Sequence, residues 1–113
     1  MNTLSTHALD TTLGRPAAGL PLRLEFQEAG EWKELASAVT NSDGRVAQLL
    51  PKDMKLSQGI YRMTFDTHAY FQLHGQVGFY PYVSIVFELK GVGEHYHIPL
   101  LLSPYGYSTY RGS

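Results

Sequence analysis

The chain has 113 residues, a formal net charge of −1 at pH 7, a pI near 6.5 and no cysteine. This length predicts one domain, residues 1–113, with a single modest hydrophobic core. The charge gives no electrostatic reason to expect nucleic acid or an anionic membrane as a partner, and the lack of cysteine excludes a disulfide framework and a thiol nucleophile.

The first half of the chain is typical of an all-β protein, because glycines and prolines separate short apolar runs that alternate in strand fashion. The clearest predicted strand covers residues 20–26. Residues 32–39 follow a turn at residues 29–30 and are predicted to pair with that strand as a hairpin. Asn-Ser-Asp-Gly at residues 41–44 is turn chemistry, after which residues 45–46 are predicted to begin a short strand.

One short helix is predicted at about residues 67–74. Asp66 or Thr67 can accept the free N–H groups of its first turn, and Gly75 can provide a left-handed exit. Three residues at helical spacing are predicted to form its apolar face: Ala69, Tyr70 and Leu73.

Further strands are predicted at residues 59–65, at residues 82–89 and on both sides of a turn at residues 103–106. Seven or eight short strands with one helix indicate a β-sandwich. No basic stretch followed by an apolar run opens the chain, and no window approaches the ~20 apolar residues of a membrane span. We therefore expect a cytoplasmic protein.

Strand alternation decides which polar side chains can share a face. In the first strand Ser5 and His7 lie opposite the core side chains, and in the strand from residue 95 His95 and His97 do so. In the last strand three residues line up on one side: Ser108, Tyr110 and Gly112. The sequence alone does not say whether these outward faces adjoin one another.

Each polar residue has an ordinary interpretation beside a functional one. Half-exposed strand histidines are common, and an arginine after a turn, such as Arg45, is usually solvated. His7, His95 and His97 could supply three imidazoles to zinc, although Arg45 would then put a fixed positive charge beside the cation. A serine nucleophile is weaker still, since no Gly-x-Ser-x-Gly elbow is present.

Several short strings occur in the order expected for one family. They are LSTHALD at residues 4–10, TNSDGR at 40–45, GIY at 59–61, FDT at 65–67 and HYHIPLLLSPYGYSTYRGS at 95–113. Together they resemble the 5-hydroxyisourate hydrolases, the enzyme branch of the transthyretin family. The resemblance spans nearly the whole chain.

The resemblance implies an all-β, transthyretin-like β-sandwich of two four-stranded sheets, with the first, seventh and eighth strands in one sheet. It implies a metal-free enzyme without cofactors, and a homotetramer, a dimer of dimers, with active sites in the channel between dimers. Tyr82 stands where the family more often has an acidic residue, and we expect it to alter edge or dimer contacts.

The implied reaction is hydrolysis of the ring amide of 5-hydroxyisourate to 2-oxo-4-hydroxy-4-carboxy-5-ureidoimidazoline in urate catabolism. The residues implied as catalytic are His7, Arg45 and His97, and those implied as substrate-binding add Tyr110, Arg111, Gly112 and Ser113. One imidazole would deprotonate water while the other orients it or protonates the leaving nitrogen, and the sequence does not assign these roles. The alternative is a small-ligand carrier, for which a lysine would be expected at position 7.

Overall fold

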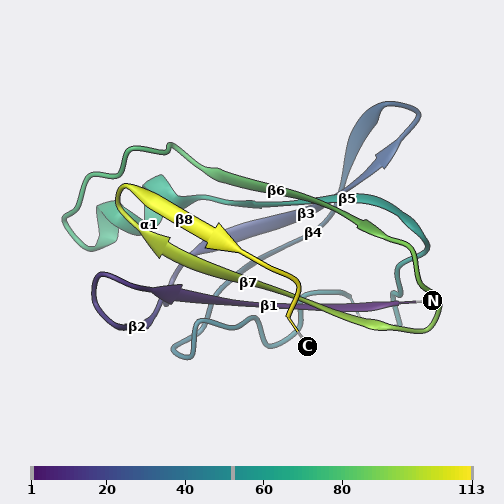
Figure 1. Cartoon of the computed structure of the whole chain (residues 1–113), viewed down its shortest axis with the longest axis horizontal. Helices are drawn as coiled ribbons and strands as arrows, with labels where there is room; N and C mark the ends of the chain where they lie inside the picture. The colour runs from purple at the N-terminus through teal and green to yellow at the C-terminus, as the bar shows by residue number, and fades with distance from the viewer. Residues whose placement is uncertain (1, 52, 113) are drawn as a thin grey trace.

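The computed structural model describes residues 2–51 and 53–112, and Figure 1 shows two stacked β-sheets with one short helix. One sheet has the strand order β2-β1-β7-β8 and the other has the order β4-β3-β5-β6. The elements are β1 (Thr3–Asp10), β2 (Arg15–Pro16), β3 (Pro21–Glu28), β4 (Glu31–Val39), β5 (Gly59–Phe65), α1 (Thr67–Leu73), β6 (Val83–Leu89), β7 (His95–Ser103) and β8 (Gly106–Thr109). The predicted sandwich of two four-stranded sheets is confirmed, and β1, β7 and β8 share a sheet as expected.

β1 and β7 come from opposite ends of the chain and pair in parallel. Their register joins Leu4 to Tyr96 and Ala8 to Leu100, so the core faces of the two strands coincide. All four of these side chains are buried, whereas Ser5, His7 and His97 between them are only partly buried. The period-2 alternation read from the sequence therefore places one face of this sheet in the core and leaves the other face outward.

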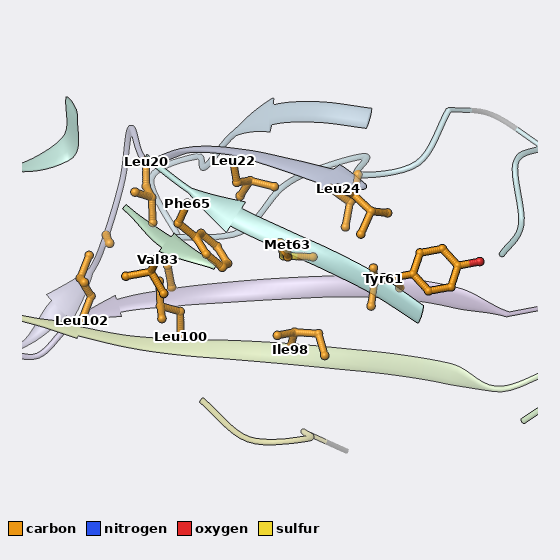
Figure 2. Close-up of a cluster of buried hydrophobic side chains, with 14 of the residues drawn as sticks. Leu20, Leu22, Leu24, Tyr61, Met63, Phe65, Val83, Ile98, Leu100 and Leu102 are labelled. Atoms are coloured by element: carbon orange, nitrogen blue, oxygen red, sulfur yellow. The ribbon is translucent and has the colours of Figure 1, made fainter. Parts of the chain in front are cut away.

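The hydrophobic core fills the space between the two sheets. Figure 2 shows the inward side chains of β3, β5 and β6 facing those of β7. Its largest fully buried members include Tyr61, Phe65, Leu24, Met63 and Leu100. Because these side chains come from both sheets, the core holds the outer face of β1 and β7 in a defined position.

The helix begins and ends near the predicted bounds, but its buried face differs from the prediction. The Asp66 side chain accepts a hydrogen bond from the Ala69 N–H at 3.1 Å, and Gly75 has φ +65°. Three residues of α1 are buried, namely Thr67, Tyr70 and Phe71, whereas Leu73 is 70 % exposed. The Tyr70 hydroxyl donates to the Asp10 carboxylate at 2.6 Å and orients the helix. No helix in the described residues is long and apolar enough to cross a membrane.

The strand predicted at residues 45–46 is wrong. Arg45 forms one isolated bridge with His7, and Leu56 forms another with Asn2, so the intervening chain follows the edge of β1 without pairing continuously. Leu49 between them is buried in the core instead. The fourth strand of this sheet is the two-residue β2, which pairs with the end of β1.

Candidate functional site

The outer face of β1 and β7 gathers a group of polar side chains. The parallel register pairs Thr3 with His95 and Ser5 with His97, and His7 follows on the same face of β1. His7 and His97 are half-buried, whereas His95 is exposed. Two imidazoles from opposite ends of the chain are therefore held side by side by backbone pairing between strands.

A turn at residues 41–45 places Arg45 next to this face. The Asn41 side-chain oxygen accepts hydrogen bonds from the N–H groups of Asp43 at 2.9 Å and Arg45 at 3.2 Å, and the Asn41 N–H donates to the Arg45 carbonyl at 2.7 Å. Arg45 then bridges to His7 on β1. Asparagine favours this geometry because its side chain satisfies backbone groups that a turn leaves free.

Gly44 joins this turn to β1. Its carbonyl accepts a hydrogen bond from the Ala8 N–H at 2.8 Å, and its φ is +74°. A Cβ at this position would lie 2.2 Å from the Ala8 carbonyl oxygen, so only glycine fits. The close backbone approach brings Arg45 within reach of the histidines.

The hydrogen bond of His7 determines which of its nitrogens carries the proton. His7 Nε2 lies 2.9 Å from the Asp43 carbonyl oxygen. A carbonyl oxygen can only accept, so Nε2 donates and Nδ1 of the neutral ring carries the lone pair. The turn that positions Arg45 thus also orients His7.

His97 has a different environment. Its Nδ1 lies 2.8 Å from the Ser5 hydroxyl oxygen. Its pKa is lowered, first by burial and then by the charges of Arg45, His7 and His95. The imidazole therefore stays neutral at lower pH than an ordinary histidine, which is the form a general base needs.

Gly112 packs directly on the His97 ring. The Gly112 N–H donates to the His97 carbonyl at 2.8 Å, and the two residues form an isolated bridge. A Cβ on Gly112 would lie 2.6 Å from His97 Cδ2 and 3.2 Å from Pro99 Cγ. The segment after β8 therefore crosses the outer face at His97. Only glycine fits at the crossing point, because any side chain there would collide with the His97 ring.

Tyr110 and Arg111 are not beside the histidines in the single chain. They line a pocket of about 300 Å³ between β6 and β7, together with Ile85, Val86, Phe87, Glu88, Tyr96, Ile98 and Thr109. The Arg111 guanidinium lies 4.5 Å from the centre of the Tyr96 ring and 3.8 Å from the Glu94 carboxylate. Ser113 lies outside the described residues. Of the predicted site residues, the chain brings together His7, Arg45, His97 and Gly112.

The sequence did not reveal that the hydroxyl groups of Thr3 and Ser5 contact the imidazoles of the site. The hydroxyl oxygen of Thr3 lies 2.7 Å from His95 Nδ1, and that of Ser5 lies 3.0 Å from His95 Nε2 as well as close to His97. Alternation had placed Ser5 on the same face as His7, but only the parallel register brings its hydroxyl between two imidazoles.

The outer face thus offers three imidazoles and a guanidinium, which can move protons and hold an anionic or carbonyl-rich ligand. Within residues 2–51 and 53–112, no group of three or more His, Cys, Asp or Glu side chains is arranged to hold a metal ion. Because Arg45 is exposed and His7 and His97 are only half-buried, this face of a single chain is open rather than enclosed.

Comparison with known proteins gives consistent matches. The family model for the HIUase/Transthyretin family matches residues 4–112. The 5-hydroxyisourate hydrolase of Mus musculus is 48% identical over 112 residues, covering 97% of this chain and 94% of the mouse protein. That of Halalkalibacterium halodurans is 45% identical over 115 residues, with 97% of each protein covered.

Two solved structures share the fold. Klebsiella pneumoniae 5-hydroxyisourate hydrolase has a TM-score of 0.87 and 38% identity, covering 100% of both chains. Sea bream transthyretin in complex with thyroxine has a TM-score of 0.90 and 33% identity, covering 96% of this chain and 93% of that one. The similar TM-scores mean that backbone shape alone does not separate a 5-hydroxyisourate hydrolase from a protein bound to thyroxine.

Proposed function

This chain belongs to the HIUase/Transthyretin family, and from that membership we propose that it is a hydrolase acting on 5-hydroxyisourate. The mouse and bacterial relatives carry the name of that enzyme. The observation that supports the proposal best is the meeting of His7, Arg45 and His97 on one face from three distant segments. A carrier needs a ligand pocket, but it has no need of two imidazoles with defined hydrogen-bond partners.

We assign the general base to His97. Its Nδ1 is engaged by Ser5, which leaves Nε2 to take a proton from water. The water oxygen then bonds to the carbonyl carbon of the ring amide, and the carbonyl electrons become an oxyanion that Arg45 stabilises. When the C–N bond breaks, the leaving nitrogen takes a proton from His97 Nε2.

His7 would orient the attacking water. Because Nε2 of His7 donates to the Asp43 carbonyl, Nδ1 is the nitrogen that can accept a hydrogen bond from that water. Arg45 would also hold the substrate, since a planar guanidinium matches adjacent carbonyl oxygens in one plane. Gly112 would contribute by its close packing on His97. Substrate contacts by Tyr110, Arg111 and Ser113 stay predictions.

We further propose that the protein acts as a homotetramer, a dimer of dimers with the outer faces lining a shared channel. An open face cannot exclude water from a reaction, and an apposed face would enclose it. β6 and β8 are edge strands, and near them Val86 and Tyr107 are exposed, as is Tyr82 before β6. Such edges are suited to pairing with a second copy, and light scattering after size exclusion would measure the oligomer.

The test of the function uses uricase and urate to generate 5-hydroxyisourate, whose ultraviolet absorbance decays. Added protein should accelerate that decay, and His7→Ala, Arg45→Ala or His97→Ala should each lower turnover at least ~10-fold. His68→Ala on the exposed face of α1 is the control and should keep full activity. No acceleration by folded wild-type protein, with tight ligand binding instead, would favour a carrier. The cytoplasmic location stays a prediction that cell fractionation can check.

A further inference from the structure

Four side chains on the outer face form a continuous hydrogen-bonded chain. Thr3 Oγ1 lies 2.7 Å from His95 Nδ1, His95 Nε2 lies 3.0 Å from Ser5 Oγ, and Ser5 Oγ lies 2.8 Å from His97 Nδ1. Each distance is within the ordinary hydrogen-bond range. The chain runs from the exposed residues Thr3 and His95 to the half-buried His97.

The single hydroxyl proton of Ser5 couples the two imidazoles. A serine hydroxyl can donate only one hydrogen bond, so it cannot donate to His95 and His97 together. When Ser5 donates to His95 Nε2, His97 must donate from Nδ1, and its Nε2 carries the lone pair of a base. When Ser5 donates to His97 Nδ1, His97 Nε2 carries a proton and is an acid.

We propose that Thr3, His95 and Ser5 form a proton relay that sets the tautomer of His97 and connects it to solvent. This inference rests on the proposed hydrolase function. Thr3, Ser5 and His95 are positioning residues, because they act on the reaction only through His97. The relay gives one imidazole both forms that hydrolysis needs, base for the attack and acid for the departure of the nitrogen.

The proton movements balance at every step. Water transfers a proton to His97 Nε2 as its oxygen bonds to the carbonyl carbon. His97 Nδ1 can then release its proton to Ser5 Oγ while the Ser5 proton moves to His95 Nε2, which leaves His97 neutral with a proton on Nε2. The His95 imidazolium loses its Nδ1 proton through Thr3 to solvent. As the proton on His97 Nε2 goes to the leaving nitrogen, Ser5 returns a proton to His97 Nδ1 and His95 Nε2 returns one to Ser5. His95 Nδ1 then takes one proton from solvent through Thr3, which restores the starting tautomers without forming an imidazolate.

The charges around His97 favour movement of a proton away from it. Burial of the ring opposes a lasting positive charge on His97, and so do the charges of Arg45 on the turn, His7 on β1 and His95 on β7. His95 is exposed, so water can stabilise its imidazolium. Gly112 covers one edge of the His97 ring and restricts the access of water there. A proton on His97 Nδ1 therefore leaves through Ser5.

The parallel pairing of β1 and β7 makes this arrangement possible. It aligns Thr3 with His95 and Ser5 with His97, so hydroxyl and imidazole side chains alternate across the two strands. A register change of one residue would turn Ser5 toward the core and break the chain of contacts. The relay is thus built into the sheet rather than into a mobile loop.

The experiment compares Ser5→Ala with Ser5→Thr, which keeps the hydroxyl, and with Ser108→Ala, an exposed serine on β8 as the matched control. Ser5→Ala should lower kcat about 10- to 100-fold with KM nearly unchanged, as loss of a residue that orients a reactive histidine does. Ser5→Thr should recover most of that rate, and Ser108→Ala should match wild type. His95→Ala should lower kcat about 10-fold.

Two readouts separate a relay from a purely structural role. The first readout is kcat measured in mixtures of H₂O and D₂O and plotted against the deuterium fraction. The plot should be curved for wild type, in which several protons move in one step. It should be a straight line for Ser5→Ala, in which the relay is broken and fewer protons move together. The ¹⁵N chemical shifts of His97 should change in His95→Ala, although the two rings do not share a hydrogen bond directly. Thermal melts verify that each variant is folded.

The outcomes distinguish this inference from the function on which it rests. Active wild-type protein with a fully active Ser5→Ala variant would overturn the relay and leave the hydrolase proposal standing. The relay would be overturned equally by a Ser5→Ala variant that keeps the curved isotope dependence, or by His97 shifts that do not respond to His95→Ala. Wild-type protein that does not accelerate the decay would overturn both proposals.

Discussion

Replacement of Gly112 by alanine tests whether packing on His97 matters for turnover. The new Cβ would lie 2.6 Å from His97 Cδ2, whereas ordinary contact begins at 3.4 Å, so ring and backbone must separate by about 0.8 Å. Pro99 Cγ at 3.2 Å blocks part of that adjustment. Misplacement of a catalytic group by about 1 Å can cost ~10²-fold in rate, and we expect a loss of that order in kcat/KM.

The stability of the Gly112→Ala protein should change less than its activity. Overpacking typically costs about 1–3 kcal/mol, and the segment after β8 can relieve part of it by lifting away from His97. If the His97 ring moves, the catalytic group is displaced, and if the segment after β8 lifts away, the ring is uncovered. The activity is expected to fall in both cases. Decay of 5-hydroxyisourate measures the rate, and urea unfolding measures the free energy.

Gly106→Ala, in the β7–β8 hairpin that precedes Gly112, is the matched control. A Cβ there would meet only Ser103 Oγ at 3.8 Å, an ordinary contact, and the φ of Gly106 is not in the left-handed region. This variant should keep wild-type kcat/KM. A Gly112→Ala protein with undiminished kcat/KM, or an equal loss in both variants, would refute the packing argument.

Three further predictions concern the turn, the core and the base. Gly44→Ala should destabilise the fold more than Gly30→Ala. Both residues have positive φ, but only a Cβ at position 44 would clash with the Ala8 carbonyl oxygen on β1, at 2.2 Å. Equal free energies of unfolding in urea for the two variants would contradict this. Tyr70→Phe should lower the free energy of unfolding by about 1–3 kcal/mol without changing turnover, because the buried Asp10 carboxylate loses one hydrogen-bond donor. An unchanged free energy of unfolding would count against a stabilising role for the Tyr70–Asp10 hydrogen bond. Burial and then neighbouring charges lower the pKa of His97 below 6.5, so the midpoint of the fall in kcat/KM at acid pH should lie below pH 6.5. A midpoint above pH 6.5 would exclude His97 as the base.

Several elements could be predicted because they depend on local chemistry. The core face of β7 follows from alternation, and the entry of α1 follows from the Asp66 cap. The buried face of α1 was predicted less well: spacing favoured Leu73, but the hydrogen bond from Tyr70 to Asp10 turns the helix another way. That bond joins residues far apart in the sequence, so no local pattern reveals it.

The positions of Tyr110 and Arg111 show the same limit. Alternation grouped Tyr110 with Gly112, but β8 ends at Thr109, and the chain beyond it no longer follows a strand period. Arg111 then stacks on Tyr96 at the edge between the sheets, while Gly112 returns to His97. Tyr110 and Gly112, two residues apart, therefore lie against different surfaces.

The sequence by itself determined the β-sandwich class, the strands that carry His7 and His97, and the turn that precedes Arg45. It could do so because strand alternation and turn preference are properties of a few adjacent residues. Only the tertiary structure decided that β1 and β7 pair in parallel, which puts Ser5 between two imidazoles. That pairing depends on packing of the whole core, because residues from the two ends of the chain meet only when both sheets are closed around it.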